Sequence, residues 1–205
     1  MQGTLSRTSD STHGKINIPW PPNHGERNTM NNRNLIYYAS FTGNTELVAK
    51  VIGEVFEEAG WENDIVKVSR DFDPKHHAID FLSYDFICVG SPVLWHVPFD
   101  PLLWGIRTVS HRVEYGSMKT GPKCGLAFAT YGGAHFGEHE ADAALILLEL
   151  AYEHLGFKSV GKIAVPGKVS HRGMNDWYFP DMHTRPNQND LDRVRAMTME
   201  AIAMV

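Results

Sequence analysis

The chain has 205 residues, 42% of them hydrophobic, and a formal net charge of −5. That length supports one sizeable core and is short for two, so we expect one domain plus a tail. No basic stripe is present that would bind nucleic acid, and no run has the length of a membrane span or the pattern of a signal peptide, so we expect a cytoplasmic protein without membrane partners.

Residues 1–33 precede the first apolar run and consist mainly of small polar, charged, Pro and Gly residues. Segments of this composition bury too little apolar surface to fold. We therefore expect a flexible N-terminal arm over 1–33 and a single domain over 34–205. An apolar cluster at Ile16, Ile18 and Trp20 is the exception. Two alternatives stay open for it: it docks on the domain or on a partner, or it has no role.

The first predicted strand covers 34–39 and is apolar throughout, as a strand buried on both faces should be. A helix is predicted over 44–59, where apolar residues recur every three or four positions. The turn between them is polar: Ser40, Thr42, Gly43, Asn44 and Thr45. Such a turn exposes N–H groups at a helix N-terminus, where the helix dipole attracts anions. This predicts a phosphate site; the alternative is that the turn only caps the helix.

Strand-like and helical runs then alternate along the rest of the chain. Strands are predicted at 63–69, 84–90, 123–130 and 159–165, and helices at 76–82, 99–110, 137–155 and 188–203. This alternation indicates a doubly wound α/β domain with a parallel sheet covered on both faces. Cys88 and Cys124 fall within strands, so we expect them to be buried core residues rather than a redox pair.

Ligands of doubly wound domains bind beyond the carboxyl ends of the strands, where the strand order reverses. Two further loops are therefore of interest. The loop after the third strand contains Ser91, Pro92, Val93, Leu94 and Trp95. Trp95 is expected to be exposed, with a face on which a flat ligand stacks. The loop after the fourth strand contains Thr130, Tyr131, Gly132 and Gly133, and its glycines let the backbone approach a ligand closely.

Together, these three loops resemble those of the flavodoxin-like FMN-binding proteins over residues 34–203. The resemblance implies a five-stranded parallel sheet in the order 2-1-3-4-5, helices on both faces, and FMN as cofactor. The FMN phosphate would be held by Ser40, Thr42, Gly43, Asn44 and Thr45. The isoalloxazine would be flanked by Ser91, Pro92, Val93, Leu94 and Trp95. Its pyrimidine side would be lined by Thr130, Tyr131, Gly132 and Gly133.

The chain contains eleven histidines. His135 and His139 are four residues apart, but no carboxylate or Cys falls into a fixed ligand spacing with them, so no metal site is expected. No catalytic residue is assigned from the sequence. His135 or His96 is a candidate proton source near the flavin edge, because histidine titrates near neutral pH.

The segment 168–189 is longer than this fold requires. We expect it to cover the flavin or to form a subunit contact in an oligomer; a surface loop packed by its own aromatic residues is the alternative.

Two functions fit the sequence. The first is a one-electron carrier or partner-dependent redox module that acts with redox partner proteins. The second is an NAD(P)H-dependent FMN oxidoreductase that delivers electrons to a quinone or similar small acceptor. The long 168–189 segment and the mild acidity favour the enzyme. The match of three loops and the lack of a nicotinamide-binding fingerprint favour the carrier, which we expect.

Overall fold

The structure is a computed structural model, and it describes residues 32–73, 79–110, 123–132, 137–168 and 182–205. Five strands form one sheet: β1 (Arg33–Ala39), β2 (Glu62–Val68), β3 (Phe86–Pro92), β4 (Cys124–Tyr131) and β5 (Lys158–Pro166). All neighbouring strands are parallel, in the order β2-β1-β3-β4-β5. The predicted doubly wound architecture is therefore confirmed.

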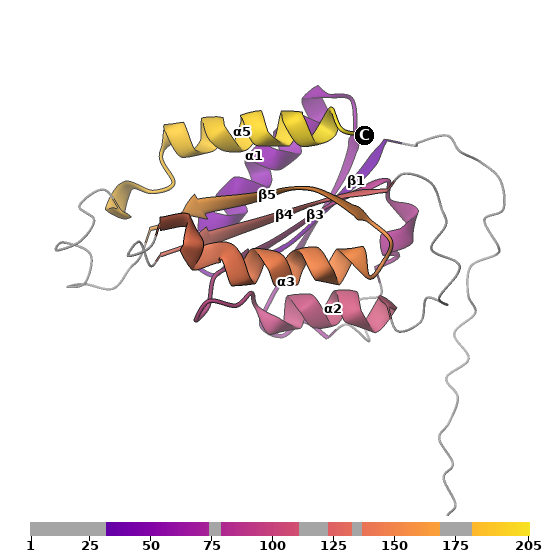
Figure 1. Ribbon diagram of the computed structural model, residues 1–205, viewed down its shortest axis with the longest axis horizontal. Helices are drawn as coiled ribbons and strands as arrows, with labels where there is room; N and C mark the ends of the chain where they lie inside the picture. The colour runs from indigo at the N-terminus through magenta and orange to yellow at the C-terminus, as the bar shows by residue number, and fades with distance from the viewer. Residues whose placement is uncertain (1–31, 74–78, 111–122, 133–136, 169–181) are drawn as a thin grey trace, which may run out of the picture.

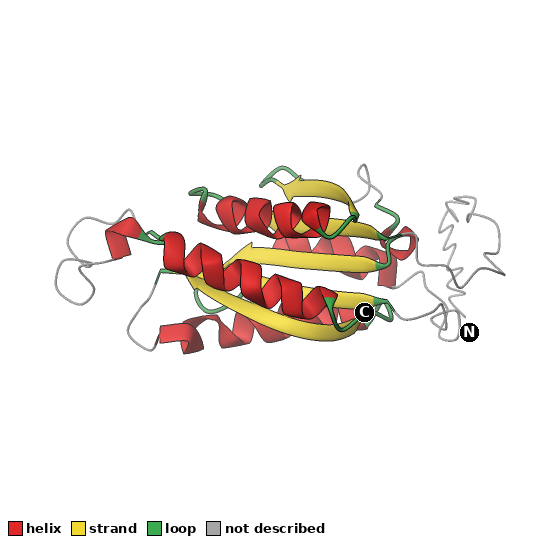
Figure 2. Cartoon of the chain, turned by 90° about the horizontal axis from the view of Figure 1, so that it is seen from above, coloured by secondary structure: helices red, strands yellow, loops and turns green. Residues whose placement is uncertain are grey.

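Two layers of helices cover this sheet (Figure 1). The α-helices of the described residues are α1 (Asn44–Glu58), α2 (Asp100–Ser110), α3 (Asp142–Glu153) and α5 (Gln188–Ile202). Helices α1 and α5 lie on one face, and α2 and α3 lie on the other. Arg195 of α5 joins the first pair, because its Nη1 lies 3.2 Å from Oε2 of Glu54 in α1. Figure 2 shows that the helices run along the strands rather than across them.

The central strand β1 contributes to the core on both faces of the sheet. Leu35 and Tyr37 pack into the cluster beneath α2 and α3, whereas Ile36 and Tyr38 pack into the cluster beneath α1 and α5. This follows from the alternation of side chains along a strand. The continuous apolar run that predicted this strand therefore reflects burial on both sides. Cys88 and Cys124 are also buried, as predicted, and both are free cysteines.

The prediction of a helix over 76–82 is wrong for the residues that the structure describes. Residues 74–78 lie outside the described residues, and the chain that follows forms only a single 3-10 turn, η1 (Phe81–Ser83). A helix of seven residues has too few hydrogen bonds to offset its nucleation cost. Phe81 instead packs edge-on against Tyr37, with ring centroids 5.2 Å apart.

The helix predicted over 137–155 is present but divided. It begins as a 3-10 segment, η2 (Gly137–Ala141), and becomes α-helical only in α3. Gly137 has a φ of +63°, a left-handed conformation that an α-helix does not continue. A further 3-10 turn, η3 (Met182–Thr184), precedes α5, whose N-terminus is closed by a capping box between Asn187 and Asp190.

The N-terminal part of the predicted domain organisation extends beyond what is described. Residues 1–31 of the predicted arm lie outside the described residues, and the sheet begins at Arg33. Among the described residues, we find no helix with the length and apolar character needed to cross a membrane.

Candidate functional site

The candidate site lies where the strand order reverses. Strand β1 pairs with β2 on one side and with β3 on the other, so the loops after β1 and β3 lie beside each other at the carboxyl edge of the sheet. The arrowhead of β5 marks this edge at the left of Figure 1. Phe41 of the first loop meets Phe99, which ends the second, with ring centroids 4.9 Å apart. The two loops predicted to bind the cofactor are therefore in direct contact.

The turn after β1 presents hydrogen-bond donors to solvent at the start of α1. Gly43 has a φ of +89°, and a Cβ placed there would have no neighbour within 4 Å. Thr42 and Gly43 are both exposed. The Thr42 Oγ1 accepts a hydrogen bond from Asn44 Nδ2 at 3.2 Å, which leaves the hydroxyl proton for a ligand. The first N–H groups of a helix also have no acceptor within the helix, so they point toward the same space.

The other two hydroxyls of this turn have structural roles. The Ser40 Oγ accepts a hydrogen bond of 3.2 Å from the backbone N–H of Glu46. The Thr45 hydroxyl bonds that of Thr130, at the end of β4, across 2.8 Å in a buried position. Of the predicted phosphate residues, Thr42 and the backbone of Gly43, Asn44 and Thr45 are therefore best placed to meet a ligand.

The Glu46 carboxylate in the first turn of α1 is balanced by neighbouring lysines. Its Oε2 lies 2.7 Å from Lys67 Nζ, and its Oε1 lies 3.8 Å from Lys50 Nζ. The hydrogen bond with Lys67 lowers the pKa of Glu46 and raises the pKa of Lys67. Both groups are therefore charged at neutral pH, and Lys67 offsets a negative charge that would otherwise repel an anion at this helix terminus.

The loop after β3 is anchored by the buried Ser91. Its Oγ accepts a hydrogen bond from the Phe99 N–H and donates one to the Pro92 carbonyl, each at 2.8 Å. The Val93 N–H donates to the Thr130 carbonyl, also at 2.8 Å. Ser91 thus closes the base of the loop, while Pro92 and Val93 are half-buried above it.

A tight hairpin at the tip of this loop holds Trp95 away from the protein surface. Leu94 and Val97 exchange two backbone hydrogen bonds, of 2.8 and 3.2 Å. Trp95 and His96 between them have φ values of +51° and +69°, the combination found in a type I′ turn. Trp95 is 95% exposed, as predicted from its position. A large aromatic face is therefore available at the carboxyl edge of the sheet.

The loop after β4 is only partly described. Tyr131 is buried, and its carbonyl accepts a hydrogen bond of 2.8 Å from the Gly167 N–H. Burial raises the pKa of its phenol, and the negative charge of Glu138 contributes to the rise. Gly132 is half-buried beyond it. Gly133 and His135 lie outside the described residues, so the roles assigned to them stay predictions.

His96 connects the hairpin to the opposite side of the site. Its Nδ1 lies 3.4 Å from Oε2 of Glu140, a residue of η2 whose side chain is only 10% exposed. Among the described residues, no three His, Cys, Asp or Glu side chains lie close enough together to hold a metal ion.

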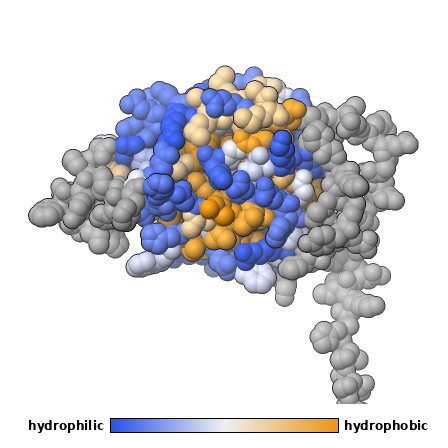
Figure 3. Space-filling model, in the orientation of Figure 1, coloured by the Kyte–Doolittle hydropathy of each residue, from blue (hydrophilic) through white to orange (hydrophobic). Residues whose placement is uncertain are grey.

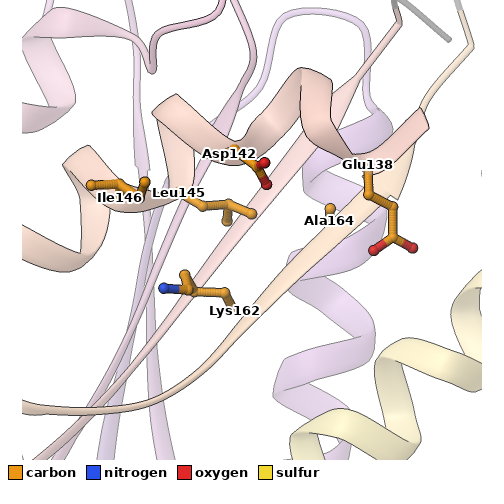
Figure 4. Close-up of a pocket in the computed structure, with 6 residues that line it drawn as sticks. All are labelled: Glu138, Asp142, Leu145, Ile146, Lys162 and Ala164. Atoms are coloured by element: carbon orange, nitrogen blue, oxygen red, sulfur yellow. The ribbon is translucent and has the colours of Figure 1, made fainter. Parts of the chain in front are cut away.

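A separate cavity of about 210 Å³ lies along the outer strand of the sheet (Figure 4). Its lining comes from η2, α3 and β5: Glu138, Asp142, Leu145, Ile146, Lys162 and Ala164. Figure 3 shows hydrophobic residues gathered on the face that carries α3, where Ile146 and Leu150 are about half exposed. None of the predicted FMN-binding residues lines this cavity.

Two residues that contact Phe41 in the loop after β1, Phe99 and Arg70, were not predicted from the sequence. Phe99 lies just before α2, outside the motif considered there. The guanidinium carbon of Arg70, in the loop after β2, lies 4.8 Å from the centre of the Phe41 ring. The sequence motifs that predicted ligand binding follow the first, third and fourth strands, so none of them indicated this contact.

Comparison with known proteins identifies the fold. No known family pattern matches the sequence, and no curated protein matches it. A flavodoxin from the domain Archaea superposes with a TM-score of 0.55 at 20% identity, over 84% of this chain and 97% of its own. A short-chain flavodoxin associated with a non-canonical PDU bacterial microcompartment superposes with a TM-score of 0.59 at 14% identity. The match covers 84% of this chain and 97% of that flavodoxin.

The rubredoxin oxygen:oxidoreductase of Desulfovibrio gigas also matches, with a TM-score of 0.57 at 18% identity. The match covers 86% of this chain but only 37% of that protein, so the present chain corresponds to one part of the larger enzyme. At these identities the likeness shows the fold. The chain has a flavodoxin-like fold, as the three loops predicted.

Proposed function

From the flavodoxin-like fold and the loops that meet at its carboxyl edge, we propose that the chain binds FMN non-covalently and transfers electrons with redox partner proteins. The observation that supports this most strongly is the start of α1, where Thr42 and Gly43 are exposed beside backbone N–H groups without helical acceptors. Bound FMN would supply the one- and two-electron chemistry. The protein would supply binding, orientation and protection from water.

Two groups of described residues support this proposal, one for each end of FMN. At the phosphate end, the Thr42 hydroxyl and the first N–H groups of α1 would donate hydrogen bonds, and the helix dipole would favour the negative charge. At the ring end, the hairpin places Trp95 within the same edge of the sheet, and its exposed face suits stacking on the isoalloxazine. The buried bond between Thr45 and Thr130 would hold the two sides of the site together.

Trp95→Ala is expected to weaken FMN binding without weakening the fold. Loss of an aromatic stacking partner costs about 0.5–1.5 kcal/mol, which corresponds to roughly two- to twelvefold in Kd. Trp95 is 95% exposed, so its removal uncovers almost no core, and the melting temperature of the cofactor-free protein should stay unchanged. Titration of flavin fluorescence and thermal melts test this. Equal affinity of Trp95→Ala and the wild type would show that Trp95 does not stack on the ring.

An anaerobic reductive titration of the FMN-loaded protein distinguishes a carrier from an enzyme. We expect dithionite to reduce the flavin in two separate one-electron phases of absorbance change, while NADH and NADPH alone leave the spectrum unchanged. Rapid bleaching by either nicotinamide would instead make the chain an NAD(P)H-dependent oxidoreductase with a quinone or similar small acceptor. Failure to bind FMN would contradict both functions.

A further inference from the structure

Arg70 lies against the proposed phosphate loop. Its guanidinium carbon is 4.8 Å from the centre of the Phe41 ring, and Phe41 directly precedes Thr42. Phe41 in turn packs at 86° against Phe99, whose N–H is held by the buried Ser91. The Arg70 side chain therefore stacks on Phe41, a ring that its contact with Phe99 holds in place.

The charge of Arg70 is available to a ligand. Arg70 is exposed, and it forms no ion pair with a carboxylate in the part of the chain that the structure describes. Lys67, by contrast, is paired with the Glu46 carboxylate in the first turn of α1. A guanidinium that stacks on a ring keeps its in-plane N–H donors free, and these match the oxygens of a phosphate.

We infer that Arg70 is the charged residue of the FMN site, which makes binding depend on the phosphate group. This inference rests on the proposed function. The turn from Ser40 to Thr45 contains no Lys or Arg, so its donors are neutral. Arg70, stacked on the neighbouring Phe41, would add the positive charge that these donors lack and would distinguish FMN from riboflavin, which carries no phosphate.

The test compares FMN and riboflavin as ligands of the full chain and of Arg70→Gln. We expect Arg70→Gln to weaken FMN binding roughly ten- to a hundredfold, as for loss of a charge-assisted hydrogen bond, and to leave riboflavin binding unchanged. The FMN affinity of the wild type should fall as salt is added, and that of Arg70→Gln should fall less, because screening acts on the charge that the variant lacks.

Arg107→Gln is the matched control. Arg107 is an exposed arginine in the last turn of α2, so its substitution removes the same charge at the opposite edge of the sheet. It should leave both affinities unchanged. Arg70→Lys should retain part of the FMN affinity, because it keeps the charge but loses the planar fork.

Two results would overturn the inference and leave the proposed function intact. If Arg70→Gln binds FMN as the wild type does, Arg70 has no part in the site. If it loses FMN and riboflavin affinity equally, Arg70 acts by holding Phe41 and not through the phosphate. A wild-type chain that binds no FMN would overturn the proposed function and this inference together.

Discussion

Gly105→Ala is expected to lower the free energy of unfolding by about 2–3 kcal/mol, the upper part of the range for overpacking a core. Gly105 is buried in α2, next to the hydroxyl end of Tyr37 in β1. A Cβ at this position would lie 2.1 Å from the Tyr37 Oη, far inside contact distance, and 3.1 Å from the carbon that carries the hydroxyl. Tyr37 is fully buried beside Phe81, so its ring has little room to move away.

The same geometry predicts a rescue by Tyr37→Phe. The Tyr37 hydroxyl is buried and has no hydrogen-bond partner among the described residues. Removing it should therefore be neutral or stabilising by about 1 kcal/mol, since an unsatisfied buried polar group is costly. In the Tyr37→Phe background, Gly105→Ala should cost less than about 1 kcal/mol, because the closest clash is gone and alanine favours the helix. Urea unfolding of the four proteins measures this coupling.

Gly53→Ala provides the control for helix propensity. Gly53 is also a buried glycine within a helix, α1, but a Cβ there would meet only the terminal methyl groups of Ile36 and Ile65, at 3.3 and 3.5 Å. These flexible ends can adjust, so Gly53→Ala should be close to neutral. If Gly53→Ala and Gly105→Ala destabilise the protein equally, or if Tyr37→Phe gives no rescue, the close contact between α2 and β1 is not what makes Gly105 necessary.

Gly43→Asp is expected to weaken FMN binding at least about a hundredfold, on the order of 3 kcal/mol, through repulsion between two nearby anions. Gly43 precedes α1, and a side chain there would extend into open space beside the exposed Thr42. The new carboxylate would therefore occupy the proposed phosphate site. The φ of +89° at Gly43 strains any L side chain, so the variant should be less stable than the wild type, but aspartate accepts left-handed backbone better than most residues and the protein should still fold.

Gly43→Asn separates charge from shape in this experiment. Asparagine has the same size as aspartate and an equal tolerance of the left-handed conformation, but no charge. We expect Gly43→Asn to bind FMN far more tightly than Gly43→Asp, and the two cofactor-free variants to melt at similar temperatures. Calorimetric titration with FMN measures the difference. Equal affinities of the two variants would place the phosphate elsewhere on the protein.

The fold was predictable because its signals lie in single segments. The apolar run of β1 identified a strand buried on both faces, and the three- and four-residue spacing of α1 identified a helix that covers one of them. Alternation of such segments then fixed a parallel sheet, since parallel strands need crossover connections. The helix predicted over 76–82 was wrong in its described part because an apolar residue such as Phe81 serves a contact with the distant Tyr37 that a local pattern does not reveal.

The candidate site was predictable only in its local parts. The exposure of Trp95 followed from its place at the tip of a loop with two prolines. The particular side-chain contacts between loops were not predictable, because a pattern within one segment does not show which side chain of another segment it meets. The bond between Thr45 and Thr130 and the stack of Arg70 on Phe41 are of this kind. Residues that the motif marked as ligands, such as Ser91, also serve the loop itself.

The most direct test of the proposed site is to follow the backbone amides of Gly43, Asn44 and Thr45 by NMR during titration with FMN. We expect saturable shifts of all three signals, because these N–H groups would hydrogen-bond the phosphate at the start of α1. Riboflavin, added in the same way, should leave the three signals close to their starting positions. FMN binding that does not move these amides, or the absence of saturable FMN binding, would contradict the proposal.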